Sequence, residues 1–375
     1  MTFLRNIDKY KNKTAIITDT NLKVSYKDLY FNSKSITQDL TPRSLVFLLS
    51  GNNMETIFYY VGLINSKNVI SILDKDIKIE YLKKLIKIYK PNYLVLPGNY
   101  ANIDGYFFCN KFQNYKVIQK SNNKKIDLNK DLAILLNTSG STGSSKLVRQ
   151  SYENYYTNSE SIIKKINLKS EDSVITTLPI NYTFGLSIIN THLISGSKII
   201  LNDHPILQKD FWMLYKEHKP SFFYGVPYMF EIISKLKFEK LISPKLKSIC
   251  QAGGKLNDNL FSKIVNFSKK NKLKFYSMYG QTEATARMSI LHPKYASKKI
   301  GSIGKAIPFT KIWISDDRKK KINKPFQVGE LTFSGKNVSS GYANKWSDLN
   351  KKYEKKNILY TGDLAYFDKE RFFYI

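Results

Sequence analysis

Cysteine and histidine are scarce in this chain of 375 residues. The two cysteines, Cys109 and Cys250, lie far apart in apolar surroundings, so the sequence predicts neither a disulfide framework nor a Cys-x-x-Cys metal or redox site. The four histidines show no metal-ligand spacing, and no Gly-x-Ser-x-Gly nucleophile elbow occurs. These absences argue against zinc and serine-hydrolase chemistry, and the unpaired cysteines favour a cytoplasmic protein.

Acidic residues and arginine are also few. The chain has 30 Asp and Glu against 60 Lys and Arg, which gives a formal net charge of +30, but only six of the basic residues are arginine. Bidentate recognition of phosphates and bases favours arginine, and the lysines here are scattered along the chain without forming a stripe. The composition therefore favours a solvated basic surface and no nucleic-acid partner.

Long apolar runs are missing as well. The N-terminus lacks the apolar core of a signal peptide, and the most apolar window, residues 45–64, is interrupted by "SGNNME". We therefore expect no integral membrane segment. A hydrophobic content of 42% with 14% aromatic residues is typical of a folded protein, and the length suggests two domains or one multi-lobed one.

Strand-like and helix-like segments alternate along most of the chain. The segments 44–50, 68–73 and 92–97 read as buried strands, and 53–66 and 79–90 read as helices between them. Ser25 and Ser151 are expected helix N-caps. The alternation predicts layered α/β subdomains with largely parallel sheets over residues 1–299. From residue 300 to 375, short alternating segments separated by turn residues predict a small β-rich lobe of the same domain.

A Gly-, Ser- and Thr-rich loop with one lysine, "NTSGSTGSSK" at 137–146, follows a predicted strand. By itself it is equally open to two interpretations, a phosphate cradle or a flexible turn. It is no Walker A loop, because the second required glycine would fall at Ser145 and Leu147 follows Lys146. A metal beside phosphates would then need a carboxylate from elsewhere, and Glu283 in "YSMYGQTEATARMS" is a candidate.

Together with further motifs, this loop resembles the adenylate-forming superfamily of acyl-CoA synthetases, acyl-AMP ligases and peptide-synthetase adenylation domains. "NTSGSTGSSK" resembles the phosphate loop of that family, "YGQTE" its Y-G-x-T-E motif, and "GELTFSGKNVSSGYAN" and "YTGDLAYFD" two later motifs. "FFYGVP" and "GSIGKAIP" match weaker signatures. The motifs occur in the family's order and span nearly the whole chain, so the resemblance implies the large N-terminal domain of such an enzyme.

The resemblance implies binding of ATP and Mg²⁺, with Lys146, Thr282 and Glu283 as catalytic residues. Thr282 would touch the α-phosphate and Glu283 would hold the metal. Outside the motif context, Tyr279 would read as a strand end, Glu283 as a neighbour of a helix cap and Asp363 as a turn residue. The implied nucleotide-binding residues are Thr138, Ser139, Gly140, Ser141, Thr142, Gly143 and Lys146 at the phosphates, Ala252, Gly253, Gly254 and Tyr279 near adenine, Asp363 at the ribose, and also Gly280, Gln281 and Thr282.

The implied reaction is attack of a carboxylate on the α-phosphate of ATP, which gives an acyl-adenylate and pyrophosphate. In-line positioning and charge neutralisation carry such a step. The family continues into a small lysine-bearing C-terminal domain, whereas this chain stops at Ile375. The resemblance therefore leaves two function classes: a ligase that uses a separately supplied C-terminal domain, and a catalytically incomplete ATP- or acyl-AMP-binding remnant of a truncated synthetase. In both cases we expect little adenylation by this chain alone.

The stretch "LPINYTFGLSIINTHL" at 178–193 corresponds to the family's acyl pocket and contains no acidic residue. An α-amino acid would leave its ammonium unpaired, so the resemblance favours a fatty or other small acyl acid of lipid or surface-polysaccharide metabolism. Coenzyme A and a phosphopantetheine-bearing acyl carrier protein are the alternative acceptors. The candidate pocket residues are Tyr182, Phe184, Gly185, Tyr224 and Gly225, for whose aromatic members core packing is an equally open interpretation.

Overall fold

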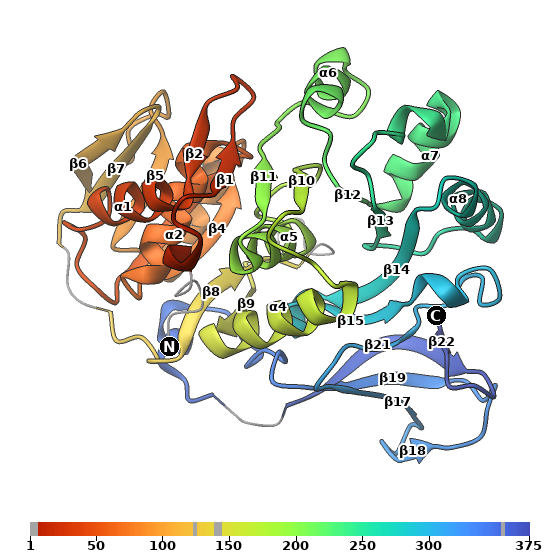
Figure 1. Cartoon of the computed structure of the whole chain (residues 1–375). Coiled ribbons are helices and arrows are strands. Elements are labelled where there is room, and N and C mark those ends of the chain that lie inside the picture. Colours follow the sequence, from red (N-terminus) through yellow and green to blue (C-terminus); the bar gives the residue numbers. More distant parts are fainter. Residues whose placement is uncertain (1–6, 123–125, 139–144, 354–356) are drawn as a thin grey trace.

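Three β-sheets and the helices packed between and around them make up the fold (Figure 1). The computed structural model describes residues 7–122, 126–138, 145–353 and 357–375. Two sheets are large, each with a parallel centre and antiparallel edges, and the third is small and antiparallel. The predicted α/β class with a β-rich C-terminal lobe is confirmed.

The eight-stranded sheet has the order β20-β9-β8-β4-β3-β5-β7-β6. Its parallel centre consists of β3 (Leu45–Ser50), β4 (Val69–Asp74), β5 (Tyr93–Pro97) and β8 (Leu132–Leu136). Every residue of β3 is buried, as the apolar run in the sequence predicts for a strand covered on both faces. The antiparallel edges are β6 (Tyr106–Phe112) and β7 (Tyr115–Lys120) on one side and β9 (Leu147–Ser151) and β20 (Tyr342–Ala343) on the other.

The nine-stranded sheet has the order β16-β15-β14-β13-β12-β10-β11-β1-β2. Six strands are parallel: β1 (Thr14–Ile17), β10 (Ser173–Ile175), β11 (Lys198–Ile200), β12 (Phe222–Gly225), β13 (Ser248–Gln251) and β14 (Lys274–Gln281). Antiparallel strands close both edges: β2 (Lys23–Ser25) at one, β15 (Ala286–Leu291) and β16 (Lys305–Ala306) at the other.

Helices α1 (Tyr26–Ser35), α2 (Met54–Asn65), α4 (Tyr152–Ile166) and α5 (Thr183–Ser195) share one apolar core with the facing sides of both large sheets. Helix α3 (Ile79–Tyr89) covers the other face of the eight-stranded sheet. Helices α6 (Lys209–His218), α7 (Pro227–Leu236) and α8 (Asp258–Lys270) lie along the nine-stranded sheet, at the top and right of Figure 1. Neighbouring residues of β12 show its two faces, since Phe223 contacts α6 and α7 whereas Tyr224 contacts α5.

Both predicted N-caps are confirmed. The Ser25 hydroxyl accepts a hydrogen bond from the backbone N–H of Asp28 at 3.0 Å, and the Asp28 carboxylate accepts one from the N–H of Ser25 at 3.3 Å. Ser151 and Asn154 form the same reciprocal pair at the start of α4. Each pair satisfies N–H groups that the first helical turn leaves without a partner.

The small sheet contains β17 (Lys311–Ser315), β18 (Lys321–Ile322), β19 (Gly329–Ser334), β21 (Ile358–Phe367) and β22 (Phe373–Tyr374), all antiparallel. In Figure 1 it lies below β14 and β15. Two short strands of this region leave it: β16 pairs with β15, and β20 pairs with β9. The C-terminal part of the chain therefore joins all three sheets.

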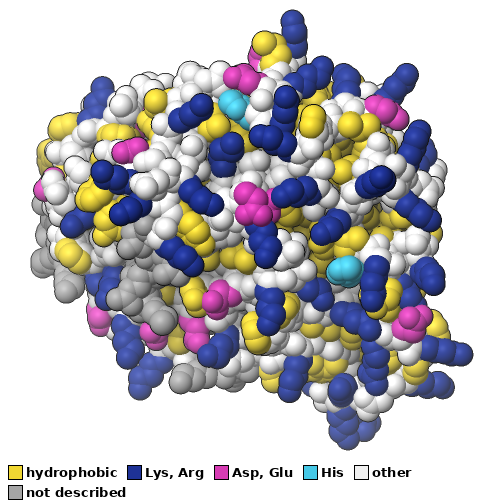
Figure 2. All heavy atoms as spheres, viewed as in Figure 1, with side chains coloured by type: hydrophobic (Ala, Val, Ile, Leu, Met, Phe, Trp, Pro, Cys, Tyr) yellow, Lys and Arg dark blue, Asp and Glu magenta, His cyan; other side chains and the backbone are white. Residues whose placement is uncertain are grey.

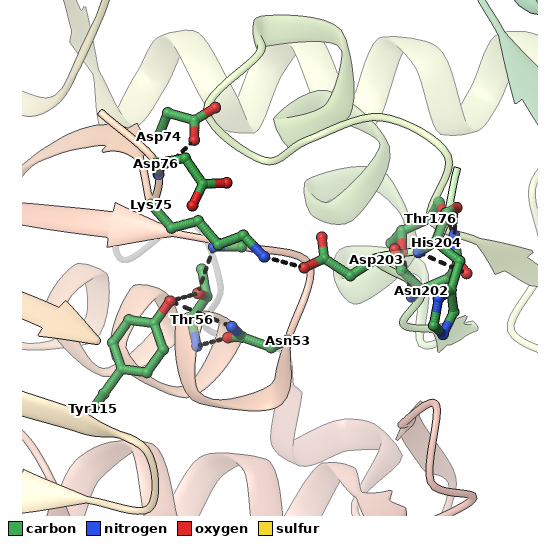
Figure 3. Close-up of polar contacts among 11 residues, drawn as sticks. Asn53, Thr56, Asp74, Lys75, Asp76, Tyr115, Thr176, Asn202, Asp203 and His204 are labelled. Atoms are coloured by element: carbon green, nitrogen blue, oxygen red, sulfur yellow. Dashed lines mark hydrogen bonds and ion pairs between the residues drawn. The ribbon is translucent and has the colours of Figure 1, made fainter. Parts of the chain in front are cut away.

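The carboxyl ends of β4 and β11 face each other across the two large sheets (Figure 3). Lys75 follows β4 and forms an ion pair with Asp203, which follows β11. The hydrogen bond from Lys75 to this carboxylate raises the pKa of the lysine. Asn53 and Tyr115 lie beside it, with the Asn53 amide 3.3 Å from the Tyr115 hydroxyl.

Lysine and arginine side chains are distributed over the whole of the face that Figure 2 shows, with apolar side chains between them. Within the described part of the chain, every helix is too short or too polar to cross a bilayer.

Candidate functional site

Two adjoining cavities, of about 280 and 240 Å³, lie where β13 and β14 end. Tyr182, Gly253 and Gly280 line both of them. The carboxyl ends of parallel strands are the usual ligand sites of α/β sheets. The first cavity is also lined by Gln251, Gly254, Lys255, Leu256, Phe261, Ser277, Met278, Tyr279, Gly301, Ile303, Asp363 and Ile375, and the second by Thr138, Thr183, Phe184, Ala252, Gln281, Thr282, Glu283, Ala286, Arg287 and Thr361.

Asp363, from β21, reaches into the first cavity and meets two residues of β14. Its Oδ2 atom accepts hydrogen bonds from the Tyr279 hydroxyl at 2.5 Å and from the Gln281 amide at 3.0 Å. Burial, followed by the hydrogen bond to this carboxylate, raises the pKa of Tyr279 well above its usual range, so the phenol keeps its proton and donates. The small sheet thus supplies a carboxylate that the large sheet holds in place.

Gly253 and Gly280 bring the backbone close to both cavities. Gly253 has a φ of 81°, and a Cβ there would lie 2.6 Å from the Tyr182 hydroxyl. A Cβ on Gly280 would lie 1.5 Å from the backbone oxygen of Ala286, across the irregular pairing of β14 with β15. Only glycine fits this corner, which leads directly into the turn Thr282–Ala284.

Thr282 and Glu283 line the second cavity. The Thr282 hydroxyl lies 2.8 Å from that of Thr183, at the start of α5. The Gln150 amide donates to the Thr282 carbonyl and the Ser339 N–H donates to the Glu283 carbonyl, the latter at 2.7 Å. Both backbone contacts come from segments far away in sequence, and they fix the turn that presents the two side chains.

Tyr342, on β20, connects Glu283 with Lys146. Its hydroxyl donates to Glu283 Oε1, and the Lys146 ammonium lies 4.7 Å from the centre of its ring. Burial and the Glu283 carboxylate raise the pKa of Tyr342, which therefore stays a hydrogen-bond donor. The expected metal ligand and the expected phosphate-loop lysine are thus brought to the hydroxyl and the ring face of one tyrosine.

The structure places the sequence-predicted residues as follows. Thr138, Ala252, Gly253, Gly254, Tyr279, Gly280, Gln281, Thr282, Glu283, Asp363, Tyr182 and Phe184 line the two cavities, whereas Gly185, Tyr224 and Gly225 lie in the protein behind them. Ser139, Gly140, Ser141, Thr142 and Gly143 lie outside the described residues. The roles given to individual residues stay predictions.

Four contributors were not identified from the sequence: Gln150, Thr183, Arg287 and Tyr342. Tyr342 stood inside a motif and Arg287 shortly after one, and neither was assigned a role. The sequence contained a signal for Arg287, because only six of the 60 basic residues are arginine and one of them stands there. In the structure Arg287 is 1% exposed. Guanidinium groups suit buried positions better than ammonium groups, since they are more weakly hydrated.

Known proteins share this fold and these sequence features. The family model described as AMP-binding enzyme matches residues 3–343. A 2-succinylbenzoate–CoA ligase of Listeria innocua is 28% identical over 256 residues, which cover 67% of this chain and 50% of the relative. The chain spans about half the length of this relative, and of the similar ligase from Bacillus cereus.

Among solved structures, that of the o-succinylbenzoate coenzyme A synthetase MenE from Bacillus subtilis, in complex with ATP and magnesium ion, matches with a TM-score of 0.79 at 19% identity. The match covers 100% of this chain and 78% of the other. The N-terminal subdomain of Klebsiella oxytoca NpsA, in complex with 3-hydroxyanthranilyl-AMSN, matches with a TM-score of 0.78 at 18% identity, over 100% of this chain and 98% of the other. These likenesses establish the fold, and together with the family match they lead to one conclusion: the chain belongs to the AMP-binding enzyme family.

Proposed function

We propose that this chain binds ATP with Mg²⁺ and activates a carboxylic acid as its acyl-adenylate, for transfer to coenzyme A. The observation that carries the proposal is the junction of the two cavities at Gly280 and Thr282. One cavity offers a half-buried carboxylate and glycine backbone suited to a nucleoside, and the other offers hydroxyls, a carboxylate and aromatic walls. Thr282 would lie where the α-phosphate meets the acid.

The nucleoside end is suited to a ribose. Asp363 Oδ2 accepts hydrogen bonds from the Tyr279 hydroxyl and the Gln281 amide. The carboxylate has further lone pairs, which can accept hydrogen bonds from the ribose hydroxyls. The glycine backbone at 253–254 borders the same cavity and leaves space for a flat base.

Magnesium fits the donor set at the phosphate end. The described residues contain no cluster of three or more His, Cys, Asp or Glu able to hold a metal alone. Glu283 supplies one carboxylate to the second cavity. Magnesium commonly binds through one or two carboxylates plus substrate phosphates, so Glu283 would hold the ion that enters with ATP, and the ion would offset phosphate charge.

In the proposed step, a carboxylate oxygen of the acid forms a bond to the α-phosphorus while the bond from that phosphorus to the bridging oxygen breaks. Pyrophosphate leaves with the bonding electron pair, and no proton is transferred. The Thr282 hydroxyl would donate to an α-phosphate oxygen, and Lys146 would face the departing phosphates. Tyr342 would position both Glu283 and Lys146 in the absence of nucleotide, since it contacts both.

The substrate named for the relatives indicates which class of carboxylic acid this chain would activate. The matched ligases act on 2-succinylbenzoate, which is not a fatty acid and carries an aromatic ring, a ketone and two carboxylates. The sequence favoured a fatty or other small acyl acid, and of these we propose a small polar or aromatic acid and no fatty acid. The same relatives are named as CoA ligases, so coenzyme A is the proposed acceptor of the acyl group.

Calorimetry with the full chain tests the nucleotide site. We expect wild-type protein to bind AMP without metal and ATP more tightly with Mg²⁺ than without it. Glu283→Gln should remove the effect of Mg²⁺ and leave AMP binding intact. Glu153→Gln is the matched control, because Glu153 pairs with Lys336 at the surface and lines neither cavity. A chain that binds neither nucleotide would refute the proposal.

Pyrophosphate exchange over a panel of carboxylic acids tests the chemical step. We expect slow exchange by this chain alone, because it spans about half the length of the ligases that it matches, and faster exchange when the remaining part of such a ligase is added in trans. Nucleotide binding with no exchange under either condition would support the remnant function instead.

A further inference from the structure

Arg287, on β15, is a buried cation behind the second cavity. It is 1% exposed, and its guanidinium donates to the Ser187 hydroxyl from Nε at 3.2 Å and from Nη2 at 2.8 Å. Nη2 also donates to the Ser187 carbonyl at 3.0 Å and to the Thr191 hydroxyl at 3.3 Å. None of the ion pairs among the described residues includes Arg287, so its charge has no carboxylate to balance it.

Three polar atoms in this neighbourhood have no hydrogen-bond partner among the described residues: Arg287 Nη1, the Tyr224 hydroxyl and His192 Nε2. The Tyr224 ring lies beside both of the other groups: its centre is 5.8 Å from the Arg287 guanidinium carbon and 5.8 Å from the His192 ring centre. Buried polar atoms are normally paired, because an unpaired one has lost its bond to water. Arg287 and the Tyr224 hydroxyl interact with each other, and Tyr224 also interacts with Cys250, but no carboxylate of the described residues pairs with either.

Phe184 packs against this cluster and, like Arg287, lines the second cavity. Its ring centre lies 5.7 Å from the guanidinium carbon and 6.0 Å from the Tyr224 ring centre. Phe184 and Arg287 both line the second cavity together with Thr282. Arg287 therefore borders the cavity in which we place the acid, and Tyr224 lies next to it across the Phe184 ring.

We propose that Arg287 selects acids that carry a second carboxylate, which pairs with Arg287 Nη1 and the Tyr224 hydroxyl when the Phe184 ring turns aside. This inference rests on the proposed function. A carboxylate accepts both donors and neutralises the buried charge. An apolar tail would leave the guanidinium uncompensated, and an ammonium group would be repelled by it.

Calorimetry with stable acyl-adenylate analogues tests this selection. The probes are acyl-sulfamoyl adenosines in three matched pairs: succinyl with butanoyl, glutaryl with pentanoyl, and adipoyl with hexanoyl. We expect the full wild-type chain to bind the carboxylate member of at least one pair about 10- to 100-fold more tightly, the range of a charge-assisted hydrogen bond. Arg287→Met should reduce that preference below about threefold, and Arg287→Lys should retain part of it.

AMP binding separates the possible failures. If wild-type protein binds AMP, and binds each neutral analogue as tightly as its carboxylate partner, the inference is overturned and the proposed function stands. If it binds neither AMP nor any analogue, both are overturned. A merely structural role for Arg287 would lower the stability of the variants and leave the preference unchanged, which also overturns the inference.

Tyr224→Phe keeps the test decisive if Arg287→Met does not fold. It retains the ring between His192 and Phe184 and removes one of the two donors. We expect a smaller preference for the second carboxylate and an unchanged affinity for AMP, and an unchanged preference would count against the inference.

Discussion

His192 should make the stability of this protein depend on pH between about 6.5 and 4. The side chain is fully buried on α5, where its ring packs against Phe222 and Tyr224. Its Nδ1 lies 2.9 Å from the Ile188 carbonyl, which can only accept, so Nδ1 carries the proton of the neutral ring. Burial lowers the pKa of His192 from 6.5 to about 4.

The folded protein therefore binds a proton at His192 less readily than the unfolded chain does. Protonation favours unfolding, so this contribution is present above pH 6.5 and is lost as the pH falls toward 4. With these two pKa values, the linkage relation gives a loss of about 2 kcal/mol in the free energy of unfolding between pH 7 and pH 5. Other groups titrate in the same range, so the test must isolate this one.

Urea unfolding of wild type and His192→Phe at several pH values provides that isolation. Phenylalanine retains the ring contacts and cannot titrate, and every other ionisable group is common to both proteins. We expect the difference in unfolding free energy between variant and wild type to shift by about 2 kcal/mol in favour of the variant from pH 7 to pH 5. A difference that stays constant over that interval would refute the reasoning.

Three further changes have clear expected outcomes. Gly280→Ala would place Cβ 1.5 Å from the Ala286 oxygen, so we expect a loss of at least about 3 kcal/mol in urea unfolding, and near-wild-type stability would contradict the close approach. Asp363→Asn exchanges charged for neutral hydrogen bonds, so AMP affinity measured by calorimetry should fall about tenfold, and unchanged affinity would remove Asp363 from the ribose site. Lys75→Met removes the ion pair with Asp203 at side chains 34% and 42% exposed, so the unfolding free energy should change by less than about 1 kcal/mol and less again in molar salt. A larger effect would mean that this contact holds the two large sheets together.

Segments with a continuous apolar run or a clear cap were predicted from the sequence. The buried strand β3 and the capped helices α1 and α4 form where local chemistry and tertiary packing agree. The hairpin of β6 and β7 was assigned no element, because most residues of β6 are exposed or half-buried without alternation. Its pairing at a sheet edge depends on neighbours that the local pattern does not describe.

The site divides in the same way. Motif residues such as Thr282 and Glu283 were found because they lie close together in the sequence. Tyr342 was missed because its contacts with Glu283 and Lys146 follow from the pairing of β20 with β9, and a strand of two residues has no periodicity to read. Arg287 was missed because an arginine beside a motif reveals neither its burial nor its lack of a counter-ion.

The pairing of β9 with β20 also has a consequence during synthesis of the chain on the ribosome. All five residues of β9 are buried in the finished protein, and among the described residues β20 and the segment before it pair with its outer edge, through contacts such as Val148 with Tyr342 and the hydrogen bond from the Arg149 N–H to the Gly341 carbonyl. An emerging chain can assemble the rest of the eight-stranded sheet long before these partners are made. Until then it carries an open strand edge, which is a template for aggregation. A chain interrupted before residue 340 should therefore depend on chaperones to stay in solution, although its parallel strands are already complete.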